Sequence, residues 1–207
     1  LPTEKKHMSI RHKLCEYGTG IPSILTILFG AAYGSVNTFI AMMASEVGIE
    51  NAGLFFIVGT IFVFISRPFG GRIFDSKGGF WVILPGGILY LIGLGILVSA
   101  QSLTVLLVAS VFYGFGGGLL LPSLMTWMLN VVTPDRRSGA SATFYNMLDI
   151  GTSSGIILLG SVAGSIGYVN MYYYVIGVMV IFIAFFMFNH FVLQKKVKKQ
   201  NEQEELA

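Results

Sequence analysis

The sequence has little charge, few histidines and almost no cysteine. Only 11% of its 207 residues are charged, whereas ordinary soluble domains have about 25%. The single cysteine, Cys15, excludes an internal disulfide framework. His7 and His12 precede the first long apolar run, and His190 lies at the end of the last one. The chain therefore lacks the facing histidines and carboxylates of a metal site or membrane-embedded hydrolase, and we expect no enzyme activity and no cofactor.

Long hydrophobic runs dominate what the sequence does contain. Hydrophobic residues make up 54% of the chain, which is typical of a membrane protein. A run needs roughly 20 apolar residues to cross a bilayer, and it must be helical because lipid offers the backbone no hydrogen-bond partners. The sequence therefore predicts an all-α membrane protein with six transmembrane helices, at Ile21–Ser45, Ala52–Phe69, Phe80–Ala100, Leu103–Val132, Gly139–Ile166 and Tyr168–Leu193.

Basic residues are absent from every second connection between these runs. All 13 Lys and Arg lie before the first run, around the turn from the second run to the third, around the turn from the fourth to the fifth, or after the sixth. The positive-inside rule then predicts that both ends of the chain are cytoplasmic. The net charge of +3 reports this topology, so no nucleic-acid partner is needed to explain it. We expect a cytoplasmic connection at 1–20, the membrane unit at 21–193 and a disordered cytoplasmic tail at 194–207.

A short charged and glycine-rich stretch at 67–79 separates the second run from the third, and we expect it to form a tight turn. Within it, Gly71, Asp75 and Gly78 follow the order G-x-x-x-D-x-x-G, with Lys77 before the last glycine. At this place between two spans, the pattern resembles the signature loop of the major facilitator superfamily of transporters. The match is partial, because the family's strong form has an arginine directly after the aspartate, where this sequence has a serine.

The resemblance implies that the six spans form one half of a twelve-helix bundle, built from two three-helix repeats of inverted topology. Tyr33-Gly34 and Tyr113-Gly114 lie three spans apart and would then be equivalent positions. Two departures favour the C-terminal half. The fourth span lacks the arginine that precedes its glycine-rich run in many N-terminal halves, and Gly151–Gly155 contains no proline. The implied partner is the N-terminal six-helix half.

The fifth run narrows the expected function. The stretch from Gly139 to Gly151, followed by Gly167-Tyr168, is similar to bacterial proton-driven drug and metabolite exporters. The resemblance implies a secondary transporter in a bacterial cell membrane, which exports a small amphiphilic solute in exchange for protons. The alternative is proton-coupled uptake of a polar nutrient such as a sugar or an organic acid. Sugar sites usually need several Asn, Gln and charged groups, and the spans contain few.

Asp149 is the only charged residue deep within a span. It lies ten residues beyond Gly139, hence about 15 Å into the membrane and near its midplane. A carboxylate there costs roughly 2.5–3.5 kcal/mol, so it is expected to carry protons or to pair with a cationic substrate. The alternative is that it merely ties its helix to a neighbour through hydrogen bonds. Asn146 and Ser153 of the same span are expected hydrogen-bond donors to it. The other candidate cavity residues are polar or aromatic: Asn146, Tyr145, Tyr33, Asn37 and Tyr113.

The stretch between the second and third runs is the expected cytoplasmic gate. We expect Asp75 to cap a helix N-terminus or to pair with Arg67, Arg72 or a basic residue of a neighbouring helix. Such a contact would close the inner side and break during turnover. The alternative is an exposed ion pair worth only about 0–1 kcal/mol. The candidate gate residues are Arg67, Gly71, Arg72, Asp75, Lys77 and Gly78.

Two groups of residues mark the predicted outer surface. Glu46 and Glu50 follow the first span, and we expect both carboxylates to be solvated. Four tyrosines near the start of the last span have the position of interfacial anchors: Tyr168, Tyr172, Tyr173 and Tyr174.

Overall fold

The computed structural model describes the backbone of residues 18–204 and the side chains of residues 18–192. Six helices in this part of the chain are long and apolar enough to cross a membrane, which confirms the predicted class. The elements are α2 (Gly20–Glu46), α3 (Leu54–Lys77), α4 (Phe80–Val98), α5 (Leu103–Asn130), the short 3₁₀ turn η1 (Pro134–Arg136), α6 (Arg137–Ile166) and α7 (Tyr168–Glu204).

The second span ends later than the sequence predicts. We expected a turn from Arg67 onward, but α3 continues through Pro68 to Lys77 and only Gly78 and Gly79 form the turn. A stretch of charge shows where a helix leaves the bilayer and does not itself stop the helix. The helix stops at Gly78, whose φ of 88° lies in the region that favours glycine.

The last helix also continues past its predicted end. The apolar part of α7 ends at Val192, whereas the helical backbone reaches Glu204. This differs from the disorder expected for the tail. Lys, Gln and Glu are strong helix formers, so a preformed helix can extend through them. The predicted connection at 1–20 lies mostly outside the described residues, as does the end of the tail at 205–207.

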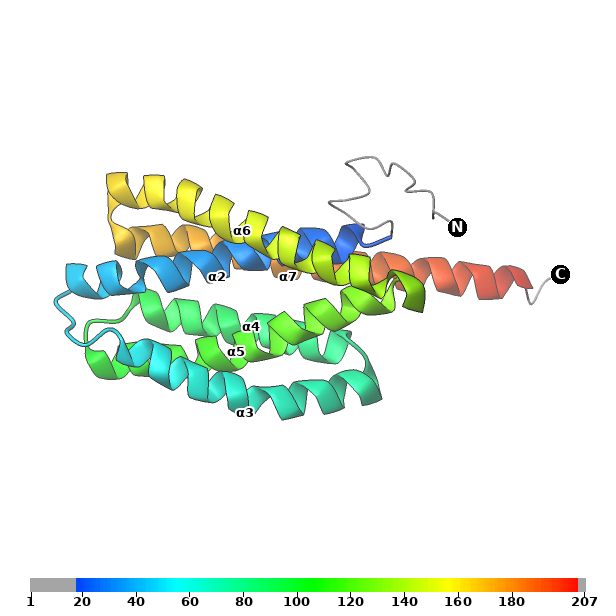
Figure 1. Ribbon diagram of the computed structural model, residues 1–207, viewed down its shortest axis with the longest axis horizontal. Helices are drawn as coiled ribbons and strands as arrows, with labels where there is room; N and C mark the ends of the chain where they lie inside the picture. The colour runs from blue at the N-terminus through cyan, green and yellow to red at the C-terminus, as the bar shows by residue number, and fades with distance from the viewer. Residues whose placement is uncertain (1–17, 205–207) are drawn as a thin grey trace, which may run out of the picture.

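The helices run side by side along the long axis of the molecule (Figure 1). In this view α6, α2, α5 and α3 follow one another from top to bottom, with α7 and α4 partly hidden behind them. The α3–α4 and α5–α6 connections share one end of the bundle with the start of α2, and the other connections lie at the opposite end. The basic connections therefore lie on one side, although their cytoplasmic orientation remains a prediction.

Packing between the helices follows the expected inverted repeat. Helix α2 packs closely on α6, and α5 packs closely on α3. If α2–α4 and α5–α7 are equivalent repeats, these two contacts are the same contact seen from each repeat. Gly34 faces Thr152 of α6, and Gly114 faces Gly59 of α3. The two Tyr-Gly pairs thus occupy equivalent positions, as the sequence suggested.

Glycines set how closely these helices approach. A Cβ on Gly30 would lie 2.7 Å from the carbonyl oxygen of Leu148, and one on Gly155 would lie 2.5 Å from that of Ala31. A Cβ on Gly114 would overlap the backbone of Gly59. Small residues that let backbones meet are the usual means of joining helices in lipid, where apolar burial provides little driving force.

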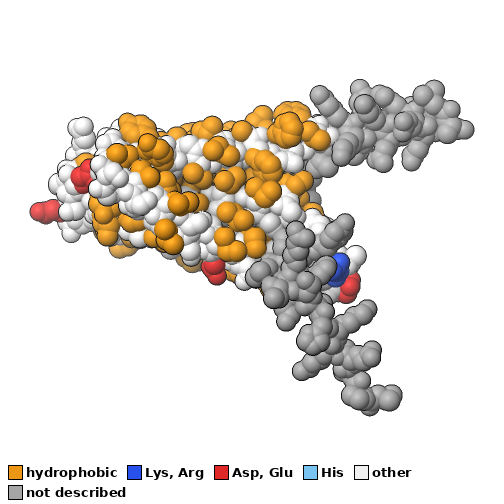
Figure 2. Space-filling view, turned by 90° about the horizontal axis from the view of Figure 1, so that it is seen from above, with side chains coloured by type: hydrophobic (Ala, Val, Ile, Leu, Met, Phe, Trp, Pro, Cys, Tyr) orange, Lys and Arg blue, Asp and Glu red, His pale blue; other side chains and the backbone are white. Residues whose placement is uncertain are grey.

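The outer surface differs in part from expectation. The backbone N–H of Tyr168 donates a hydrogen bond of 2.6 Å to Oε2 of Glu46, so Glu46 caps the start of α7 and is not merely solvated. Glu50 is exposed, as predicted. On the face shown in Figure 2, hydrophobic side chains extend along the bundle, and charged ones gather toward its ends apart from one acidic side chain part-way along.

The α5–α6 connection opens the next helix with a short 3₁₀ turn. Proline at the first position of η1 leads directly into α6. A hydrogen bond from the Thr133 side chain, followed by one from the backbone, holds the pKa of the exposed Asp135 carboxyl below its usual value. Asp135 is therefore an ionised surface group, which makes it a suitable control for substitutions of Asp149.

Gly114→Ala should destabilise the bundle, because its new methyl group meets the backbone of Gly59. Overpacking of this kind costs about 1–3 kcal/mol. Gly95→Ala is the matched control, since nothing lies within 4 Å of its Cβ position and alanine favours a helix. Thermal unfolding of the full-length protein in detergent should show a lower midpoint for Gly114→Ala only. Equal midpoints would contradict the assignment of Gly114 to a close backbone contact.

Candidate functional site

Three of the predicted cavity residues meet where α2 faces α5. Nδ2 of Asn37 donates a hydrogen bond of 2.9 Å to the hydroxyl of Tyr113 and another of 2.7 Å to the carbonyl oxygen of Tyr33. Asn37 and Tyr33 are half-buried, and Tyr113 is buried. This bond joins the first helix of one repeat to the first helix of the other.

Behind this contact lies a cluster of aromatic rings that the sequence did not reveal. The ring of Tyr113 lies 5.0 Å from that of Tyr90 on α4 and 5.2 Å from that of Phe55 on α3. Tyr90 also packs against Phe29 of α2, with 5.5 Å between ring centroids. Tyr90 is fully buried, and its hydroxyl makes no hydrogen bond of normal geometry among the described residues, although it interacts with the neighbouring Tyr113 hydroxyl. Nothing in the sequence around Tyr90 distinguishes it from a lipid-facing tyrosine.

Tyr172 was assigned to the wrong place by the sequence. It is fully buried, and its hydroxyl also lacks a partner among the described residues, whereas Tyr173 and Tyr174 are 60% and 56% exposed. The helical period of the sequence could have predicted that Tyr172 is buried. Tyr168, Tyr172 and Val175 are spaced as one face of α7, and that face packs inward. Tyr172 is therefore a core residue and not an interfacial anchor.

The predicted residues of α6 lie on a different surface. Tyr145 is 52% exposed, Asp149 is exposed and Asn146 is half-buried. Asp149 stands twelve residues from the start of α6, hence about 18 Å along the helix. No hydrogen bond to Asp149 occurs within the described residues, so neither Asn146 nor Ser153 holds it as we suggested. Within this part of the chain, Asp149 does not tie α6 to a neighbour.

The opposite side of α6 holds the helix in place. Gly151 and Gly155 pack against Ile27 and Ala31 of α2, and Thr152 donates a hydrogen bond of 3.3 Å to the carbonyl oxygen of Gly30. Gly151 and Gly155 are turned away from the side that carries Asp149, whereas Thr152, three residues beyond Asp149 and seven beyond Tyr145, lies at the boundary between the two sides. The carboxylate consequently projects from a helix whose other face is fixed.

The expected gate residues separate into two places. Arg67, Gly71 and Asp75 lie one helical turn apart on α3 and line a groove of about 230 Å³ against α5. The wall from α5 is formed by Pro122, Ser123 and Thr126. Arg72 is exposed on another side of α3, and Lys77 and Gly78 line a separate cavity.

The contacts expected for Asp75 inside the chain are absent. No ion pair of Asp75 with Arg67 or Arg72 occurs among the described residues. The guanidinium of Arg67 instead lies 5.4 Å from the ring centre of Phe64, in a cation–π contact. The N-terminus of α4 at Gly79 has no side-chain cap, so Asp75 does not serve there either. A partner from a neighbouring helix outside these residues remains the prediction.

Comparison with known proteins places this geometry in a family. The model of the Major Facilitator Superfamily matches residues 23–207. The chain belongs to the major facilitator superfamily. Its six helices resemble a crystal structure of the peptide transporter POT in complex with alafosfalin, with a TM-score of 0.72 and 17% identity, over 84% of this chain and 39% of that one. At this identity the likeness supports the fold.

Two curated superfamily members are similar in sequence. The proton-coupled antiporter flippase LtaA of Staphylococcus saprophyticus is 26% identical over 91% of this chain and 46% of its own length. The staphylopine export protein of Staphylococcus aureus is 26% identical over 80% of this chain and 42% of its own length. The chain thus spans about half the length of these relatives. It is a membrane transporter chain of the superfamily, with the dimensions of one six-helix half.

Two buried tyrosines, Tyr113 in the polar contact and Tyr90 behind it, should respond oppositely to loss of their hydroxyls. Tyr113→Phe removes the acceptor of Asn37 and should destabilise the protein by about 0.5–1.5 kcal/mol. Tyr90→Phe removes an unsatisfied buried hydroxyl and should be neutral or stabilising. Thermal unfolding of both variants in the full-length protein measures the difference. If Tyr90→Phe lost as much stability as Tyr113→Phe, the Tyr90 hydroxyl would be hydrogen-bonded.

Proposed function

We propose that this chain is half of a secondary active transporter that exports a small amphiphilic solute from a bacterial cell in exchange for protons. Family membership supports transport, and the printed names of two similar proteins describe a proton-coupled antiporter and an exporter. The observation that carries the proposal is Asp149, an exposed carboxylate in the middle of α6. Protons and the solute are its proposed ligands.

The surroundings of Asp149 favour an amphiphilic substrate over a sugar. At helical spacing the same side of α6 carries Ala142, Tyr145 and Ser153, with the exposed Ile157 beside them. Together with the half-buried Asn146, this surface has one carboxylate, one phenol, one amide and one small hydroxyl between apolar groups. A sugar site needs several amide and charged groups in a row, and α6 does not provide them.

The partner of this surface is proposed to be the other six-helix half. Asp149 would cost roughly 2.5–3.5 kcal/mol if it faced hydrocarbon, so its exposed side should face protein or water in the complete transporter. The N-terminal half, packed against the side of the bundle formed by α2, α3, α5 and α6, would supply that environment. Tyr33, Asn37 and Tyr113 would then either line the cavity wall that faces Asp149 or lie next to that wall.

Asp149→Asn should abolish proton-driven transport while preserving the shape of the site. The amide cannot change its charge, so protonation can no longer favour one access state over the other. The full-length transporter in proteoliposomes, with ethidium as the amphiphilic probe, should lose accumulation driven by a pH gradient but retain downhill exchange. Asp135→Asn, in the exposed α5–α6 connection, is the matched control and should accumulate the probe normally.

Two outcomes of this experiment bear on different parts of the proposal. Wild-type pumping by Asp149→Asn, with unchanged pH dependence, would remove Asp149 from the coupling step. Failure of the wild-type protein to move ethidium in either direction, together with proton movement driven by a sugar, would instead support the uptake alternative.

Asp75 is proposed to act in the gate through a partner outside this chain segment. The groove that contains Asp75 lies between α3 and α5. It also contains the neighbouring Arg67, whose guanidinium already makes a cation–π contact with Phe64. Asp75→Asn should leave expression unchanged and slow turnover, because the charge contact that closes the inner side is lost. Initial exchange rates in the same proteoliposomes, with Asp135→Asn again as control, test this. Unchanged turnover of Asp75→Asn would leave only an exposed surface charge.

A further inference from the structure

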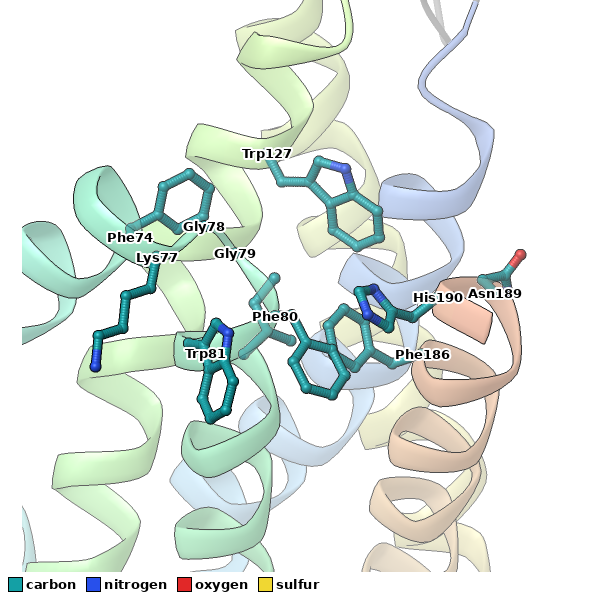
Figure 3. A pocket seen from close by; sticks show the side chains of 11 residues that line it. Phe74, Lys77, Gly78, Gly79, Phe80, Trp81, Trp127, Phe186, Asn189 and His190 are labelled. Carbon is teal, nitrogen blue, oxygen red and sulfur yellow. The ribbon is translucent and has the colours of Figure 1, made fainter. Parts of the chain in front are cut away.

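A second cavity lies at the same end of the bundle as the α3–α4 turn. Its volume is about 530 Å³, and it is bounded by the end of α3, the start of α4, α5 and α7 (Figure 3). Its lining side chains include Lys77, Phe80, Trp81, Trp127, Phe186 and His190. A cavity of this size is in the range of small-molecule sites. It differs from the groove that holds Asp75 and lies on helices that do not carry Asp149.

Aromatic side chains form most of its wall. The ring of Phe80 stacks on that of His190 at 4.1 Å and on that of Phe186 at 5.8 Å. Trp127 meets Phe186 edge to face, also at 5.8 Å. The other tryptophan of the chain, Trp81, is 59% exposed beside Phe80. A ligand that fills this cavity must therefore present apolar surface.

The polar groups at the cavity favour a negative charge. Lys77 stands at one rim, across from His190, and its long side chain extends outward from that rim (Figure 3). The N-terminus of α4 opens into the cavity at Gly79, and it has neither a side-chain cap nor an acidic residue in its first turn. The positive end of a helix and its free N–H groups bind anions such as phosphate. No carboxylate occurs among the residues that line the cavity.

The position of the cavity matches the depth of lipid headgroups. It lies where α3 ends and α4 begins, and His190 stands two residues before Val192, where the apolar span of α7 ends. Tryptophan and basic residues are enriched at this level of a membrane protein. Basic residues of the connections gather at the same end of the bundle, so an anionic lipid is attracted there.

We infer that this cavity binds an anionic glycerophospholipid from the adjacent leaflet. Lys77 and the N-terminus of α4 hold its phosphate, and its glycerol and upper acyl chains cover Trp81 and the aromatic wall. A free phosphate ion would satisfy the charge but leave the aromatic surface uncovered, which is why a lipid fits better. This site is separate from the proposed transport pathway and does not depend on it.

The two tryptophans allow the site to be observed directly. The full-length protein is reconstituted in mixtures of phosphatidylcholine with brominated phosphatidylglycerol, and in the reverse mixtures, and tryptophan quenching is measured. The component lost in Trp127→Phe reports the cavity. It should show phosphatidylglycerol enriched several-fold over phosphatidylcholine. Equal quenching by the two brominated lipids in the wild-type protein would overturn the inference.

Lys77→Gln tests the charge, with Arg72→Gln as the matched control. Both substitutions remove one positive charge near the end of α3, but only Lys77 lines the cavity. A basic residue near an anionic surface contributes about 1 kcal/mol, so Lys77→Gln should lower the preference for phosphatidylglycerol about fivefold. Arg72→Gln should leave the preference within twofold of wild type. Equal losses in the two variants would mean general surface attraction and no site.

Inorganic phosphate separates a lipid site from a site for a soluble anion. Added at millimolar concentration and constant ionic strength, it should leave the preference for phosphatidylglycerol at Trp127 unchanged. If phosphate abolished that preference, the cavity would be a phosphate site and the lipid assignment would be wrong. The transport rate is not the readout, so a failed proton-antiport proposal would not affect the result.

Discussion

The close approach of backbones at glycine is the constraint on which the rest of the structure depends. In lipid, apolar burial between helices contributes little, so contact between backbones has to hold the bundle. Gly151 and Gly155 press α6 against α2, and Gly114 and Gly118 press α5 against α3. The inverted repeat relates the α2–α6 pair to the α5–α3 pair, so the same kind of glycine contact occurs twice. The polar bond from Asn37 to Tyr113 then joins the pairs, and its geometry depends on both of them.

The same packing explains which parts of the bundle are fixed and which are free. The glycine-bearing side of α6 is committed to α2, so the side with Tyr145 and Asp149 has no partner among the described residues. Along α3, Gly59, Ser66 and Gly70 are buried, Phe55 packs on Tyr113 of α5, and other large side chains, Phe64 and Phe69 among them, are exposed. A hydroxyl or carboxylate within such a bundle either finds a neighbour, as Tyr113 does, or stays unsatisfied, as the Tyr90 hydroxyl does.

The sequence predicted the helices well because length and charge are properties of the chain itself. Apolar runs and the segregation of Lys and Arg are sufficient to place six spans. They were insufficient for the end of α3, since polarity marks the edge of the membrane, whereas the helix ends at the backbone angle of Gly78. Composition also gave a wrong prediction for Tyr172. It suggested the same interfacial position as for Tyr173, whereas the helical period points Tyr172 inward. The depth of Asp149 in the membrane follows from counting residues along the sequence. The side of the bundle that its carboxylate faces follows only from the position of α2 in the structure.

In the proposed mechanism, Asp149 connects this packing to transport. A carboxylate at mid-membrane depth is stable only where water, a cation or a proton compensates its charge. The described residues of this chain supply no hydrogen bond to it, so the compensation has to come from outside them, and it can differ between the two access states. A group whose only stabilising partners change with the conformation will gain or lose a proton when the conformation changes. Because Gly151 and Gly155 hold the other side of α6 on α2, the helix cannot simply rotate to hide the charge. Under the proposed function, protonation of Asp149 and the arrangement of the two halves would therefore be linked by the glycine contact behind it.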